Sequence, residues 1–262
     1  MNSQLVHDIL RASHIGFGSL ALVLFWVPAV ALKGSRLHVF SGRWFTRIAF
    51  AVAITATVSC IWAIIAPMSF SGITRELTTD ESERLIGSIR FLFIVLLTLT
   101  TWLVASVVMG VHSSRHRVDP PSNSSTVRYS WWISGGASVI CGCYGVFLVT
   151  GGDINGLLPV LLTWVGVSDS RKNLQFLSEP SVPEHAWIGK HIESMIGAGI
   201  AMHTAFFVFG LKQLSPIRLT GVLVLTPWVL PVALGAIAIN TLTKKYGDGL
   251  EPSKSQDAKS QP

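Results

Sequence analysis

The chain has 262 residues, of which half are hydrophobic and 13% are charged, and its mean hydropathy is +0.53. This composition excludes an ordinary soluble domain and predicts a membrane protein. The net charge of +6 is compatible with nucleic-acid binding, but the basic residues lie in short segments beside apolar runs, where they act as topology signals. We therefore predict the lipid bilayer, and not nucleic acid, as the partner.

Seven apolar runs approach the roughly 20 residues that a transmembrane helix needs. We predict an all-α polytopic transmembrane helix bundle in which residues 1–245 form one domain, followed by a disordered polar tail at 246–262. The predicted spans, in chain order, are 15–32, 48–66, 91–111, 131–149, 157–167, 190–211 and 219–239.

The segments between the spans are predicted to be loops. KGSRLHVFSGRWFTR, after the first span, is a compact basic loop, and 68–89 is a loop with room for a short surface helix. The proline pair of HSSRHRVDPPSNSS predicts a loop after the third span. The fifth run, 157–167, contains Pro159 and ends at SDSRK, so a re-entrant segment is the alternative to a full crossing there.

The distribution of lysine and arginine predicts the orientation. The loops after the first, third and fifth spans and the C-terminal tail together hold 14 of these residues, and the opposite side holds 6. The positive-inside rule therefore places the C-terminus in the cytoplasm and the N-terminus outside, and we expect the bacterial inner membrane.

Small residues predict close helix packing in the fourth and sixth spans. They are Ser138, Gly142, Gly145, Ala198, Ala201 and Ala205. The three cysteines lie in apolar runs without CxxC spacing, so we expect buried packing residues and no metal site. They are Cys60, Cys141 and Cys143.

The sixth span is the most polar of the seven, because it contains His191, Glu193 and His203. An ionisable group in the hydrocarbon core costs about 2.5 to 3.5 kcal/mol on insertion scales, so each is a candidate functional residue. We expect Glu193 to pair with Lys190 at i, i+3. Gly199 lies one turn below His203 and leaves space for a ligand ring, a neighbouring helix or a water.

Membrane depth separates the histidines into groups. Three of them, with several basic residues, come to the cytoplasmic level. These are His38, His112 and His191, with Arg36, Arg43, Arg115, Arg117 and Lys190 near them. His14 begins the first span at the outer edge, and His203 lies about 18 Å beyond His191 along the helix.

Histidines on several membrane helices suggest a b-type cytochrome, in which two imidazoles ligate haem iron. His191 and His203 are about 120° apart in helical phase, and His14 and His203 differ by about 10 Å in depth. The cytoplasmic group agrees better in depth. The candidate cofactor-binding residues are therefore His14, His38, His112, His191 and His203.

We thus expect a haem-binding or redox membrane subunit. The first alternative is a non-enzymatic transporter-like or scaffold protein whose basic cytoplasmic face binds anionic lipids or another membrane subunit. Its candidate residues are Arg36, Arg43, Arg115 and Arg117. The second alternative is a metal-dependent membrane enzyme, although the sequence has no HExxH, GxSxG, HxxxH or phosphate-loop motif and no catalytic residue can be assigned.

Two regions resemble an uncharacterised family of bacterial multi-spanning membrane proteins, a domain of unknown function. They are HIGFGSLALVLFWVPAVALKGSRLHVFSGRWF and the last two spans, with HIESMIGAGIAMHTAFFVFG and LTPWVLPVALG. The matching positions are His14, His38, Gly42, Arg43, His191, Met195, Ile196, Gly197, Thr204, Ala205 and Phe206. The resemblance covers about half the chain and implies membership of that family but no known reaction.

Overall fold

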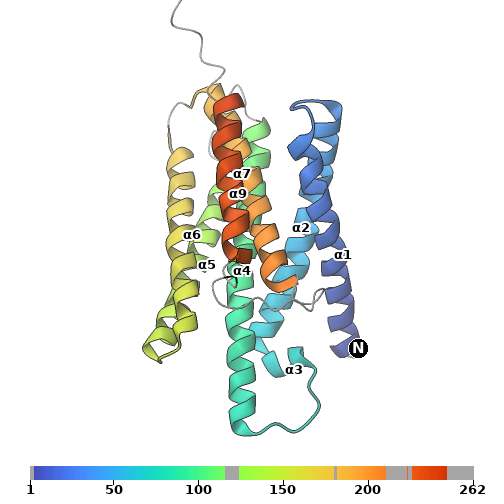
Figure 1. The fold of residues 1–262 in the computed structure, drawn as a ribbon, viewed down its shortest axis with the longest axis vertical. Helices are drawn as coiled ribbons and strands as arrows, with labels where there is room; N and C mark the ends of the chain where they lie inside the picture. The colour runs from blue at the N-terminus through green and yellow to red at the C-terminus, as the bar shows by residue number, and fades with distance from the viewer. Residues whose placement is uncertain (1–2, 116–123, 180–181, 211–222, 224–225, 247–262) are drawn as a thin grey trace, which may run out of the picture.

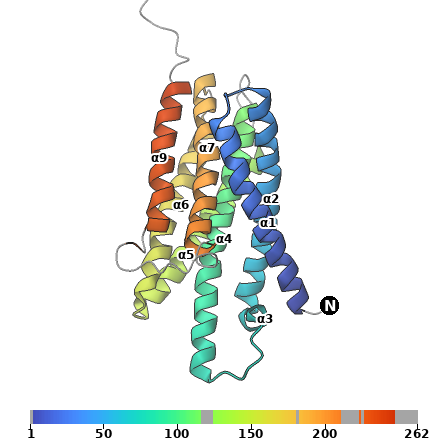
Figure 2. The same ribbon diagram turned by 45° about the vertical axis from the view of Figure 1, so that its right-hand side comes forward.

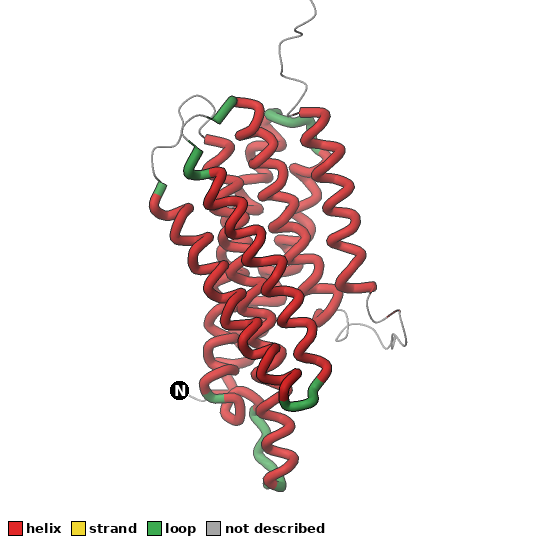
Figure 3. Tube along the Cα trace, turned by 90° about the vertical axis from the view of Figure 1, so that its left-hand side faces the viewer, coloured by secondary structure: helices red, strands yellow, loops and turns green. Residues whose placement is uncertain are grey.

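A computed structural model describes residues 3–115, 124–179, 182–210, 223 and 226–246. These residues form an all-α bundle without a strand, as predicted, and its long helices run side by side (Figure 1, Figure 3). The long helices are α1 (Ser3–Val30), α2 (Arg36–Ile65), α4 (Thr79–Arg115), α5 (Ser125–Thr150), α6 (Leu157–Phe176), α7 (Glu184–Ala205) and α9 (Thr226–Tyr246). The short ones are α3 (Pro67–Ser71), the 3₁₀ turn η1 (Ile154–Gly156) and the π-helical turn η2 (Phe206–Gly210). The predicted tail, 246–262, lies outside the described residues beyond Tyr246.

Among the described residues, six helices are long and apolar enough to cross a membrane. They are α1, α2, α4, α5, α7 together with η2, and α9. The chain is therefore a multi-pass membrane protein.

The predicted fifth span lies in α6, which is not one of those six because its second half is polar. This helix has 20 residues, about 30 Å of length, and it lies along α5 in both ribbon views (Figure 1, Figure 2). The segment SDSRK, predicted to follow the span, is helical, because no glycine or proline interrupts it. The helix is therefore longer than the predicted span of 157–167.

We call one end of the bundle the basic end, marked by Val30, Arg36, Arg115, Phe176 and Tyr246. At this end α1, α4, α6 and α9 finish and α2, α5 and α7 begin; it is the upper end in Figure 1. The Lys- and Arg-rich segments that the sequence predicts to be cytoplasmic flank these helix ends.

The predicted basic loop after the first span is largely helical. Helix α2 begins at Arg36, and the Ser35 hydroxyl accepts a hydrogen bond from the His38 backbone N–H at 3.2 Å, which is an N-cap. Gly34, with φ of 79°, makes the turn before it. The sequence interpretation missed this Gly-Ser helix start, so His38 belongs to the first turn of α2 and not to a loop.

The predicted loop at 68–89 divides in a similar way. It contains α3 and the beginning of α4, which starts at Thr79. The Thr78 hydroxyl accepts from the Glu81 N–H at 3.3 Å, and the Glu81 carboxylate accepts from the Thr78 N–H at 3.0 Å. This reciprocal pair is a capping box, and it begins α4 well before the predicted third span.

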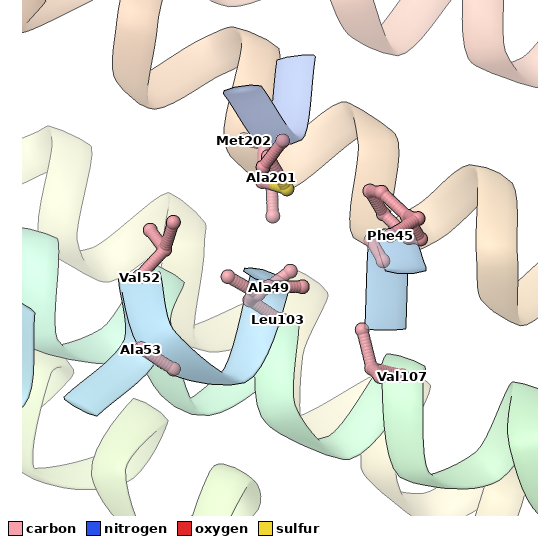
Figure 4. Packing of buried hydrophobic residues seen from close by; sticks show 10 residues of the cluster. Phe45, Ala49, Val52, Ala53, Leu103, Val107, Ala201 and Met202 are labelled. Carbon is pink, nitrogen blue, oxygen red and sulfur yellow. The ribbon is translucent and has the colours of Figure 1, made fainter. Parts of the chain in front are cut away.

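The central core lies where α2, α4 and α7 meet (Figure 4). Small residues on α2 and α7 let larger side chains from the neighbouring helices fill the space between them. The buried residues of this cluster are Ala21, Phe45, Ala49, Val52, Ala53, Leu103, Val107, Ala198, Ala201 and Met202. The core holds α2 and α7 in a fixed relation to α4, and this relation positions the histidines.

Helices α5 and α6 form a tight hairpin. A Cβ atom on Gly145 would lie 2.6 Å from the Gly156 carbonyl oxygen, and one on Gly142 would overlap the Thr163 side chain. The prediction of close packing at Gly142 and Gly145 is therefore confirmed. Cys60 and Cys141 are buried as predicted, whereas Cys143 is exposed on α5, so that expectation was wrong.

Candidate functional site

The imidazole of His38 is held by the end of α1. Its Nδ1 lies 3.0 Å from the carbonyl oxygen of Pro28. A carbonyl only accepts, so Nδ1 carries the hydrogen and Nε2 keeps the lone pair. Pro28 is close enough to the end of α1 for its carbonyl to have no partner in the helix, which explains why a neighbouring side chain can bond to it.

Lys33 completes this arrangement. Its ammonium group donates to the carbonyl oxygens of Pro28 and Ala29, at 2.9 and 2.6 Å. Partial burial lowers the pKa of Lys33 from its ordinary value. The end of α1 is thus capped by one lysine and one histidine, which ties it to the start of α2.

The imidazole of His191 is held in the same manner by α4. Its Nδ1 lies 2.7 Å from the Gly110 carbonyl oxygen, so Nδ1 is again the donor. The side chain of Met195 packs over Gly110 at the same place. Backbone carbonyls that hold Nδ1–H in this way fix the tautomer and orientation of histidines that bind metals through Nε2.

The two histidines lie next to each other. Their ring centroids are 6.4 Å apart and their planes are inclined by 71°. His38 comes from α2 and His191 from α7, 153 positions apart in the sequence. Two of the three histidines that were predicted to share one level, His38 and His191, are thus neighbours in the structure.

A cavity of about 1090 Å³ lies beside the pair, between the α1–α2 hairpin and α4, α7 and α9. Both histidines line it, and its apolar wall includes Phe25, Phe45 and Met195. Its basic lining residues are Lys33, Arg43, Arg47, Arg115 and Lys245. The lining of the cavity therefore combines apolar and cationic side chains.

Gly42 opens space inside this cavity. It follows His38 by one helical turn on α2, and no atom lies within 4 Å of the position that a Cβ atom would take. A flat ligand could therefore lie against the helix beside the His38 ring. Gly42 and Arg43 also belong to the sequence pattern noted above.

The remaining cytoplasmic candidates do not line the cavity. His112 is buried on α4 with its ring 6.0 Å from that of Trp187. Arg36 is exposed on the first turn of α2 and is not one of the lining residues. Arg117 lies outside the described residues. Of the predicted residues, the structure brings together His38, His191, Arg43 and Arg115.

His14 lies elsewhere on the bundle. It stands 14 residues before Pro28 on α1, which is about 21 Å along the helix. Its Nδ1 lies 3.1 Å from the Thr55 hydroxyl, which itself donates to the Ala51 carbonyl at 3.0 Å. The geometry makes His14 a donor in a helix-to-helix contact between α1 and α2.

His203 has a hydrogen-bond partner at each ring nitrogen. Nδ1 lies 2.7 Å from the Gly199 carbonyl, and the Trp26 indole N–H donates to Nε2 at 3.2 Å. The Phe25 ring fills the space above Gly199. Of the three occupants that the sequence left open for this space, the structure shows a neighbouring helix, α1.

The expected Lys190–Glu193 ion pair is present, with Nζ 2.6 Å from Oε2. Lys190 is nevertheless buried, and Asp169 is half-buried beside Asn173. The sequence interpretation also missed Lys33, Arg47 and Lys245. For Lys33 and Lys245, positions at helix ends near the other basic residues are the signal that could have found them.

No group of three or more His, Cys, Asp or Glu side chains within metal-binding reach occurs in the described part of the chain. Comparison of the chain with protein-family models, with curated proteins and with solved structures found no match.

Proposed function

We propose that this multi-pass membrane protein binds haem b at the basic end, with His38 and His191 as axial ligands and a redox role. The observation that carries the proposal is the pair itself. Two imidazoles from different helices lie at a cavity wall, and a backbone carbonyl holds Nδ1 of each. Backbone carbonyls orient metal-binding histidines in this way.

The distance supports the proposal. Nitrogen ligands lie about 2 Å from a metal ion, so two imidazoles on opposite sides of one iron have ring centroids about 6 Å apart. The observed separation is 6.4 Å. The iron of haem needs only these two side chains from the protein, so a larger cluster of ligands is not required.

The cavity supports it as well. Its apolar wall suits a porphyrin ring, and Gly42 leaves room beside His38. The basic lining suits the two haem propionates, because arginine and lysine bind carboxylates. Arg43 and Arg115 are the predicted members of this lining.

Location in the bacterial inner membrane, a cytoplasmic basic end and membership of the uncharacterised family belong to the same proposal. The positive-inside rule supports the orientation, since 14 of the 20 lysines and arginines belong to the segments predicted to be cytoplasmic.

The test is spectroscopic. The protein is produced with ample haem, purified in detergent and examined for a Soret band and for haem by pyridine extraction. We expect about one haem per chain, and a loss of about tenfold or more in His38→Ala and in His191→Ala. His14→Ala, on the same bundle but away from the cavity, is the matched control. A haem-free wild type, or haem retained in both variants, would refute the proposal.

The second candidate function is binding of anionic lipid or of another membrane subunit at the basic end. The five basic side chains that line the cavity favour it. Native mass spectrometry with added cardiolipin tests the lipid form. Arg43→Gln with Arg115→Gln should then release the lipid while His38→Ala retains it, whereas haem binding predicts that the histidine variant loses the cofactor.

A further inference from the structure

A second polar site lies between α5 and α6, away from the cavity lining. Four buried side-chain atoms there have no hydrogen-bond partner in the structure. They are Trp131 Nε1, Ser134 Oγ, Ser170 Oγ and Asn173 Oδ1. Each of these residues is 4% exposed or less. Their elements pack closely, because a Cβ atom on Gly135, next to Ser134, would lie 3.3 Å from the Ser170 Cβ.

The chemistry of these atoms identifies what can satisfy them. The Trp131 indole N–H only donates, the Asn173 carbonyl oxygen only accepts, and the two hydroxyls do both. A metal cation would satisfy the oxygens and leave the indole N–H unpaired. Water satisfies all four, and buried water typically bridges such groups.

Ionisable groups border this set of polar atoms. The Asn173 amide donates to the Asp169 carboxylate at 3.2 Å and to the Asp169 backbone carbonyl at 2.9 Å. From α7, the Lys190 ammonium lies 5.1 Å from the centroid of the Phe176 ring of α6 and 2.6 Å from the Glu193 carboxylate. The Glu193 side chain is 41% exposed, so this ion pair reaches the surface of the bundle.

We propose that Asp169 is a proton-binding site that exchanges protons with the aqueous phase through water held by Trp131, Ser134, Ser170 and Asn173. In the binding step the carboxylate accepts a proton from a water of this cluster, forming an O–H bond, and the hydroxide left behind is neutralised by a proton that arrives from bulk water past Glu193. The site shares no residue with the lining of the cavity at the basic end.

Charged groups of both signs lie near Asp169. Lys172 is on the same helix, and Lys190 and Glu193 come from α7. Arg128 of α5 donates hydrogen bonds to the Leu177 carbonyl oxygen and the Ser178 hydroxyl, just beyond the end of α6.

The test uses a carbodiimide, dicyclohexylcarbodiimide, which modifies carboxyl groups that hold a proton in an apolar setting. The full-length protein in detergent is treated over a pH series, and modified peptides are located by mass spectrometry. We expect modification of Asp169 at acidic pH, falling by about tenfold for each pH unit above its pKa. Exposed Asp153 is the internal control and should remain unmodified.

Infrared difference spectra provide a second measurement. On acidification of the wild type, the carbonyl stretching region of protonated carboxyls should contain a component that is missing in Asp169→Asn. If Asp169 is modified no more than Asp153 at every pH, the proposal is overturned by measurements on the wild-type protein alone. An unchanged infrared band in a folded Asp169→Asn also overturns it.

Discussion

The Nδ1 of His191 in α7 lies 2.7 Å from the carbonyl oxygen of Gly110 in α4. Because the carbonyl can only accept, this contact determines which nitrogen of His191 carries the hydrogen. Pro28 does the same for His38 at 3.0 Å. The proposed haem ligands are thus oriented by two backbone carbonyls on two different helices.

The first prediction concerns the space beside His38. Gly42→Leu should fill the cavity and lower bound haem by about tenfold or more, because its side chain enters the region that Gly42 leaves open. The fold should persist, since leucine favours a helix more than glycine. Haem content and circular dichroism measure the two effects. Gly136→Leu, at another open position on α5, should retain haem; equal loss in both variants would contradict the cavity assignment.

The second prediction concerns the α5–α6 hairpin. Gly145→Ala should destabilise the protein by about 1 to 3 kcal/mol, because the new Cβ atom would meet backbone atoms of Gly156 and Val160 that cannot move aside. Gly136→Ala is the control on the same helix, has open space, and should be neutral or stabilising. Thermal unfolding in detergent compares them, and a Gly145→Ala midpoint at or above that of the control would be inconsistent with the close packing.

The third prediction concerns the Trp26–His203 hydrogen bond. Trp26→Phe and His203→Ala should be coupled by about 0.6 kcal/mol in a double-mutant cycle, the typical size for hydrogen bonds between membrane helices. Neither change should reduce haem content, since both nitrogens of His203 are engaged in the bundle. A large haem loss on His203→Ala alone would transfer the ligand role to this residue.

The fourth prediction concerns orientation and the crossing of α6. In a cysteine-free background, Asn155→Cys and Ser178→Cys place single thiols at exposed positions beyond the two ends of α6. We expect a membrane-impermeant maleimide to label Asn155→Cys in spheroplasts and Ser178→Cys only after lysis. Labelling of both from one side would show that α6 does not cross, and the reverse pattern would invert the predicted topology.

The sequence was most informative about helices and least informative about their ends. Long apolar runs predicted an all-α membrane bundle because the bilayer demands about 20 such residues per crossing. The start of α2 was missed, because Arg36 to Arg47 is too polar for a span and yet is helical once Ser35 caps it. The second half of α6 is likewise too polar for a span, and the sequence therefore predicts a loop there although the segment is helical.

The sequence by itself determined the class of protein and the separation of His203 from His191 along one helix, since both follow from composition and helical geometry. Only the tertiary structure decided which histidines meet. The packing of α2 and α7 on α4 brings His38 to His191, buries His112 against Trp187, and gives His203 the indole of Trp26. These relations depend on helix rotation and on contacts between residues far apart in the chain, which no local pattern encodes.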